Sequence, residues 1–192
     1  MTPPRQTPDT TVVGPAILAQ RIAAYQPRVS ADYWAATAVV MTHTTEGPAV
    51  LMIRRATRDA DRWSGDMALP GGKRDPGDLD VPFTAARETL EETQVHVGRP
   101  VGRLDDVVGR PSSHRIATAV FTVTGRPEPV PEPDEVAQAM WLPLAALADP
   151  ANKTWHRYGG VVPFPSITVG DVMIWGLTHR ILSHFMAVTG LT

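Results

Sequence analysis

The chain has 192 residues, of which 43% are hydrophobic and 20% are charged, as in an ordinary globular domain. The sequence contains no cysteine, which excludes disulfides, cysteine nucleophiles and thiolate metal sites. A formal net charge of −2 provides no basic field for a polyanion, so we expect no nucleic-acid partner.

The beginning of the chain is polar and contains several prolines. Residues 1–14 therefore predict a flexible tail, followed by one domain over residues 15–192. This start lacks the apolar core of a secretory signal, and no uncharged apolar run reaches the roughly 20 residues that span a bilayer. We expect a cytoplasmic protein with no membrane partner.

The first half of the chain combines one helix with short strands. A proline at the first position and apolar residues at helical spacing predict a helix over 15–26. Two apolar segments, 33–42 and 49–53, flank a polar turn at 44–48 and predict a hairpin. The apolar stretch 67–69 then ends in Pro-Gly-Gly.

The second half begins with a helix that is predicted over 82–94. Its apolar side is expected to carry Phe83, Ala86, Leu90 and Thr93. Strands are predicted over 101–108 and 116–123, with a strand end at 140–142. The segments 126–134 and 155–165 are rich in proline and glycine.

The chain ends in a predicted amphipathic helix over 171–188. The element order is helix, strands, helix, strands, helix. This order predicts an α+β domain in which helices flank a mixed or antiparallel sheet.

The residues that indicate chemistry lie on the middle helix, where positions 87–92 read Arg-Glu-Thr-Leu-Glu-Glu. At 3.6 residues per turn, Glu88, Glu91 and Glu92 share one face and repel each other. A divalent cation such as Mg²⁺ would reverse that repulsion. The alternative is a solvated acidic face on which Arg87 pairs with Glu91. The glycine loop just upstream favours the metal site, because its backbone can approach a ligand closely.

This segment resembles the Nudix box, whose pattern is G-x5-E-x7-R-E-U-x-E-E-x-G-U with U bulky and apolar. Here Gly72 is followed by five residues, Asp78, eight residues and then the Arg-Glu-Thr-Leu-Glu-Glu run. The chain departs from the pattern through Asp78, one extra residue, Thr89 and Gln94. The resemblance implies an α/β/α sandwich around a mixed sheet. It also implies a hydrolase that uses Mg²⁺ or Mn²⁺ to cut a diphosphate bond in a small nucleotide derivative.

The resemblance also implies roles for individual residues. The main metal-binding glutamates are Glu91 and Glu92, and Glu88 is a further ligand or assists the general base. Arg87 would orient a carboxylate by a charge-assisted hydrogen bond, while Asp78 matches an outlying acid with a structural role. The remaining metal ligands would be the Gly71 carbonyl and a late acid, for which Glu135 is preferred over Glu132. A solvated loop is the alternative for both late acids.

Other segments are similar to the coenzyme A diphosphatase branch of the family. They are Lys73 to Asp78, the Trp175 to Thr178 segment and, in part, the arginines upstream. This similarity implies a coenzyme A substrate whose phosphates contact Arg54, Arg55, Arg62 and Lys73. A solvated basic loop is the alternative for the arginines.

Several functional alternatives remain open at this stage. The substrate could be ADP-ribose, a dinucleotide or a nucleotide sugar, and a non-catalytic binding module of the same fold is a further alternative. Trp63 could stack on a base, although packing is the commoner role for a lone loop tryptophan. Trp175 is expected in the core, and a homodimer is left open.

Overall fold

The computed structural model describes residues 14–44, 47–58, 63–109 and 113–191. Within these ranges, one seven-stranded sheet has the order β3-β2-β1-β6-β5, while β4 pairs with β1 and β7 pairs with β2. β1 and β6 are parallel and the remaining pairs are antiparallel, so the sheet is mixed. The strands are β1 (Ala35–Thr44), β2 (Gly47–Arg55), β3 (Met67–Ala68), β4 (Gly71–Lys73), β5 (Gly102–Val108), β6 (Arg115–Thr122) and β7 (Val136–Pro143).

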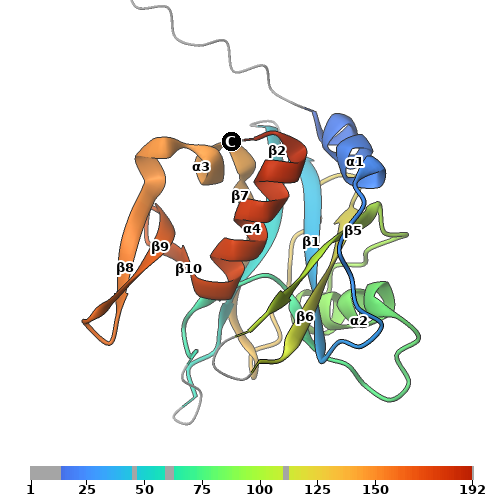
Figure 1. Cartoon of the computed structure of the whole chain (residues 1–192), viewed down its shortest axis with the longest axis horizontal. Coiled ribbons are helices and arrows are strands. Elements are labelled where there is room, and N and C mark those ends of the chain that lie inside the picture. The colour runs from blue at the N-terminus through green and yellow to red at the C-terminus, as the bar shows by residue number, and fades with distance from the viewer. Residues whose placement is uncertain (1–13, 45–46, 59–62, 110–112, 192) are drawn as a thin grey trace, which may run out of the picture.

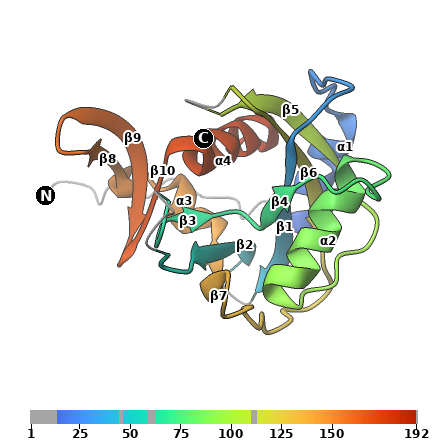
Figure 2. The ribbon, with the colours of Figure 1, turned by 90° about the horizontal axis from the view of Figure 1, so that it is seen from below.

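Helices cover both faces of this sheet (Figures 1 and 2). Helix α2 (Val81–Thr93) packs on one face, while α1 (Pro15–Ala24) and α4 (Gly176–Thr189) pack on the other. The α/β/α sandwich expected from the sequence is therefore confirmed. The predicted tail over 1–14 lies outside the described residues except for Gly14. Among the described residues, no helix is both long and apolar enough to cross a bilayer.

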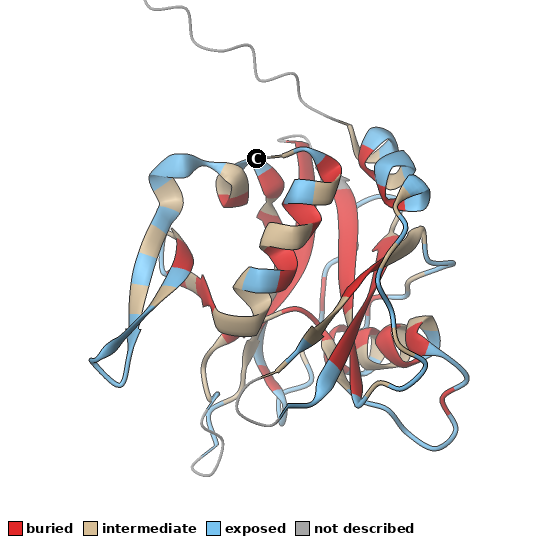
Figure 3. Ribbon diagram, in the orientation of Figure 1, coloured by how far each residue is buried: buried red, intermediate tan, exposed pale blue. Residues whose placement is uncertain are grey.

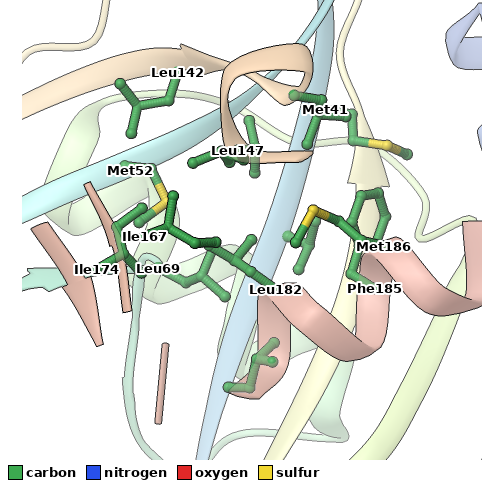
Figure 4. Packing of buried hydrophobic residues seen from close by; sticks show 14 of the residues in the cluster. Met41, Met52, Leu69, Leu142, Leu147, Ile167, Ile174, Leu182, Phe185 and Met186 are labelled. Atoms are coloured by element: carbon green, nitrogen blue, oxygen red, sulfur yellow. The ribbon is translucent and has the colours of Figure 1, made fainter. Parts of the chain in front are cut away.

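Strand alternation divides the interior into two cores. On β1, Ala38 and Val40 face the core under α2, whereas Val39 and Met41 face the core under α1 and α4. Successive side chains of a strand point to opposite faces, so a central strand buried on both sides is apolar throughout. Figure 3 shows this continuous burial along β1 and β2, and Figure 4 shows Met41 close to Met186 and Phe185 of α4.

The predicted hairpin is confirmed, but its turn is shorter than expected. β1 continues to Thr44 and β2 begins at Gly47, so the turn is shorter than the segment 44–48 that the sequence predicts. Likewise, the strand end expected at 140–142 belongs to the longer strand β7. Local composition alone does not fix these strand ends, because pairing depends on neighbouring strands as well.

The C-terminal part contains a second sheet that the sequence did not predict. Strands β8 (Lys153–Tyr158), β9 (Val162–Val169) and β10 (Val172–Trp175) pair antiparallel after the short helix α3 (Leu144–Ala148) and the 3₁₀ turn η1 (Pro150–Asn152). The helix predicted over 171–188 is wrong in its first five residues, since α4 begins at Gly176. A four-residue apolar run fits a strand or a helix equally well by periodicity, and pairing with β9 decides the outcome.

The buried side of helix α2 agrees only in part with the predicted one. Thr93 is buried as predicted, whereas Phe83 is 45% exposed and Val81, Ala85 and Thr89 occupy other buried positions. The hydroxyls of Thr89 and Thr93 donate to the carbonyls of Ala85 and Thr89, each at 2.6 Å. Because these hydroxyls are satisfied within the helix, threonine can be buried at both positions, including position 89, where the box pattern expects an apolar residue.

The backbone conformation at the end of α2 explains why the box pattern has glycine where this chain has Gln94. Gln94 caps the helix with φ 56° and ψ 15°, in the left-handed region that glycine adopts without a steric cost. We predict that Gln94→Gly raises the free energy of unfolding by about 1 kcal/mol, whereas Gln94→Ala gives no such gain because it keeps the Cβ. Urea denaturation of the two variants measures the difference, and equal stabilities would contradict the strain argument.

Candidate active site

The glycine pair Gly71-Gly72 lies between β1 and the acidic helix. β4 pairs with β1 so that Gly71 lies opposite Thr37, and Gly71 has φ 153°. A Cβ on Gly71 would overlap the Ala36 carbonyl oxygen, and a Cβ on Gly72 would overlap the Glu88 carboxylate. Both glycines are therefore required for close approach, the first to the sheet and the second to the acid.

Two of the three box carboxylates turn inward toward this loop. Glu92 is only 4% exposed, and its Oε2 accepts a hydrogen bond from the Gly71 N–H at 2.9 Å. The side chain of Glu88 is 13% exposed and touches Gly72. The two acids are one helical turn apart, so the helix holds them side by side against the loop.

Burial makes these carboxylates costly to ionise. It raises the pKa of Glu92 to about 8, although the hydrogen bond from Gly71 and the charge of Arg55 act in the opposite direction. Burial also raises the pKa of Glu88, against the charge of Arg87. The negative charge of Glu135 raises the pKa of both acids, which places this late acid within electrostatic range of the pair. A bound cation would offset the repulsion among these carboxylates and favour their ionised forms.

Arg87 connects the acids of the loop and the helix. Its Nε donates to Asp78 at 3.1 Å, and one terminal nitrogen lies 3.0 Å from both Asp78 and Glu88. The other terminal nitrogen donates to Glu91 at 2.8 Å. The guanidinium also donates to the Lys73 carbonyl at 3.0 Å, so it ties β4 to α2.

Asp78 is buried and completes this connection. Its carboxylate accepts from the Thr84 hydroxyl at 2.8 Å and from the Asp75 N–H at 2.9 Å, in addition to Arg87. The Arg87 guanidinium holds the pKa of Asp78 well below its usual range. The shorter acid thus has its partners inside the loop and the helix, which agrees with the structural role that was expected for it.

Glu91 differs from its two neighbours. Its side chain is 56% exposed and pairs with Arg87, as the solvated-face alternative expected. Within the described residues, no three acidic or histidine side chains are arranged to hold a metal ion together. The structure therefore brings together Glu88 and Glu92, with Glu135 nearby, but leaves Glu91 at the rim.

Comparison with known families decides what this arrangement is. The family model described as the NUDIX domain matches residues 32–162, more than half of the chain. The chain belongs to the Nudix family. The match includes the Nudix box and all seven strands of the mixed sheet.

Known relatives agree with this assignment. An uncharacterised protein of Schizosaccharomyces pombe is 40% identical over 57% of the chain and 36% of its own length. The mitochondrial coenzyme A diphosphatase of Homo sapiens is 34% identical over 68% of the chain and 58% of its own length. The chain thus spans less than two thirds of either relative. A MutT/nudix family protein from Enterococcus faecalis has the same fold, with a TM-score of 0.53, 16% identity and coverage of 91% of this chain and 69% of that one.

The predicted phosphate-binding residues occupy different surroundings in the Nudix domain. Arg54 pairs with Asp171 at 3.1 Å, while the charge of Arg55 acts on Glu92. The Lys73 ammonium lies 5.3 Å from the centre of the Trp34 ring. Arg62 lies outside the described residues. Arg55 is therefore the predicted basic residue that the structure associates with the box acids.

The tertiary neighbours give two residues roles that the sequence did not indicate. His114 stacks on Trp34 with ring centres 4.2 Å apart. Gly72 was named only as the first residue of the box, yet its missing side chain makes room for Glu88. The signal for this role was the doubled glycine, because one glycine suffices for a turn and the second indicates close approach.

Proposed function

We propose that this Nudix chain hydrolyses a diphosphate linkage in a nucleotide derivative with the help of Mg²⁺ or Mn²⁺. The observation that carries the proposal is the buried pair Glu88 and Glu92 against the glycine loop. Two adjacent buried carboxylates are unfavourable unless a cation joins them. A binding module without catalysis would have no need for this arrangement, which supports the enzymatic alternative.

The donor set fits a hard divalent cation. Mg²⁺ prefers oxygen ligands and usually binds through one or two carboxylates together with substrate phosphates. Glu88 and Glu92 would supply these carboxylates, with the Gly71 carbonyl and Glu135 as further ligands. Glu91 would have to break its ion pair with Arg87 before it could bind the cation, so we propose it only as a secondary ligand. When bound, the cation neutralises the phosphates and makes a water molecule more acidic.

The residues of the chain would divide the remaining tasks. The Gly71 N–H fixes one oxygen of Glu92, so this side chain has a defined orientation before substrate arrives. Arg87 holds Glu88 from one side and leaves the side chain facing Gly72. A carboxylate oxygen of Glu88 can then accept the proton of the attacking water, as expected for a general base within reach of the reacting atoms.

The proposed substrate class is coenzyme A or its thioesters. The Lys73 to Asp78 segment and the human relative, which is named a coenzyme A diphosphatase, support this choice. Arg54, Arg55, Arg62 and Lys73 would bind its phosphates. The Nε of Arg54 is buried and has no hydrogen-bond partner within the described part of the chain, while its Nη2 pairs with Asp171. The cytoplasmic location and the homodimer play no part in this proposal and stay predictions.

Product analysis on a substrate panel tests the proposal. The protein is incubated with Mg²⁺ or Mn²⁺ and coenzyme A, an acyl-coenzyme A, ADP-ribose, a dinucleotide, a nucleotide sugar or a nucleoside triphosphate. We expect hydrolysis at the diphosphate, fastest with the coenzyme A compounds and abolished by EDTA. Preference for ADP-ribose, a dinucleotide or a nucleotide sugar would reassign the substrate, and intact substrates throughout would contradict hydrolysis.

A further inference from the structure

An aromatic cluster forms where the second sheet meets the loop between β2 and β3. Trp175 is at its centre, with ring centres at 4.6 Å from His156, 5.2 Å from Tyr158, 5.6 Å from Phe164 and 5.8 Å from Trp63. Trp63 also lies 6.3 Å from Tyr158, with ring planes inclined by 28°. These residues come from the β2–β3 loop, the β8–β9 hairpin and the end of β10.

One side of this aromatic cluster is open to solvent. Trp175 is only 8% exposed, whereas Trp63 and Tyr158 are 38% and 41% exposed. The Trp175 indole N–H donates to the Asp66 carboxylate at 3.1 Å, which fixes the central ring. The buried tryptophan therefore supports two partly exposed rings. Exposed aromatic surface on a rigid base is a common binding surface for planar ligands.

The aromatic cluster is connected to the box acids through the end of β2. The Arg55 N–H donates to the Asp66 carbonyl at 3.0 Å, and Asp66 holds Trp175. The charge of Arg55, in turn, acts on Glu92. On the same strand Arg54 pairs with Asp171, in the turn before β10. Figure 2 shows β3 and β10 side by side, with the β8–β9 hairpin on one side and β4 and α2 on the other.

We propose that Trp63 and Tyr158 form a stacking surface for the purine base of the nucleotide substrate. This inference rests on the proposed function, because it places the base on one side of Arg54 and Arg55 and the diphosphate on the other. Aromatic rings stack on any base through its π face, and neighbouring arginines bind the attached phosphates. Trp63 precedes the Nudix box in the sequence and Tyr158 follows it, so the surface combines segments from both sides of the box.

Calorimetric titration of the full chain with AMP tests the stacking surface. Ribose 5-phosphate, which has the same sugar phosphate without the base, is titrated in parallel. We expect AMP to bind the wild type at least about tenfold more tightly than ribose 5-phosphate. We expect Trp63→Ala and Tyr158→Ala to weaken AMP about tenfold each and to leave ribose 5-phosphate unchanged, while Trp63→Phe restores most of the AMP affinity.

Trp155→Ala is the matched control. Trp155 lies on the same strand as Tyr158, but an odd number of residues apart, so it points to the other face, and it is 71% exposed. This variant should bind AMP like the wild type, and thermal unfolding of each variant separates a lost contact from a lost fold. Unchanged AMP affinity in folded Trp63→Ala and Tyr158→Ala, or equal binding of AMP and ribose 5-phosphate by the wild type, would overturn the inference.

The outcome is independent of turnover. AMP binding requires no hydrolysis, so a protein that binds AMP through Trp63 and Tyr158 but cleaves nothing would support the stacking surface and contradict the proposed function. Conversely, an active protein whose KM for coenzyme A is unchanged by both folded alanine variants would contradict the stacking surface alone. A rise in KM with little change in kcat is the expected kinetic result.

Discussion

Glu92→Gln should lower kcat by at least about 100-fold while the protein remains folded. Glutamine can still accept the hydrogen bond from Gly71, but it removes the charge that we assign to the divalent cation. Steady-state hydrolysis of coenzyme A at saturating Mg²⁺ measures the effect. If the variant retained the turnover of the wild type, Glu92 would have no place in the reaction.

Glu128→Gln is the matched control for this change. Glu128 is an exposed acid in the proline-rich segment before β7, so the same chemical substitution occurs far from the glycine loop in the sequence and at the surface. We expect its activity and its stability to equal those of the wild type. A loss of activity in this control would mean that overall charge, and not the box site, determines turnover.

The same Glu92→Gln variant should be more stable than the wild type when metal is absent. Below about pH 4.5 the folded and unfolded states both keep the Glu92 proton, so its titration does not lower the free energy of unfolding there. Between pH 4.5 and about 8 the unfolded state ionises while the folded state keeps its proton, and the free energy of unfolding therefore falls as pH rises. Glutamine does not titrate and escapes this loss.

Urea denaturation in EDTA across this pH range tests the stability effect. We expect the variant to exceed the wild type by roughly 2–4 kcal/mol near pH 8 and by less than about 1 kcal/mol near pH 5. Adding Mg²⁺ should stabilise the wild type far more than the variant, because the cation binds the folded state. A pH-independent difference between the two proteins would contradict the assignment of a buried, hard-to-ionise carboxylate at this position.

Gly72→Ala should abolish most of the activity and leave the fold nearly intact. The added Cβ would overlap the Glu88 carboxylate, which is the mobile end of a side chain and can move away. The displaced acid would leave the position beside the glycine loop, so we expect kcat to fall at least about 100-fold. The free energy of unfolding should fall by no more than about 1 kcal/mol, since the three atoms nearest to the added Cβ all belong to the Glu88 side chain.

Gly77→Ala provides the matched control in the same loop. A Cβ at Gly77 would meet no atom within 4 Å, and the loop should accept it without displacing Glu88. Activity assays and urea denaturation of the two alanine variants therefore separate the close approach at Gly72 from general stiffening of the loop. Equal activities would show that Glu88 does not depend on the missing side chain of Gly72.

Much of the domain could be predicted from local patterns. The box segment, the hairpin and the helices at 15–26 and 82–94 follow from spacing and turn residues, which act over a few positions of the chain. The β8–β9–β10 sheet could not be predicted in the same way. Its strands are short and partly exposed, and their pairing partners lie elsewhere in the sequence.

The candidate site shows the same division. Spacing placed Glu88, Glu91 and Glu92 on one helical face, but burial separated them, since Glu92 lies against Gly71 and Glu91 faces solvent beside Arg87. Trp63 was a lone loop tryptophan in the sequence. In the folded domain it lies beside Trp175 and Tyr158, which are about a hundred positions away along the chain.

The sequence by itself determined the Nudix family, the sandwich fold and the helix that carries the acids, because each depends on residue types at fixed short spacings. Only the tertiary structure decided which acids are buried, that Gln94 adopts a left-handed backbone conformation and which aromatic rings are in contact. These properties depend on what packs against a residue, and the distant segments that do so are brought together only when the two cores form.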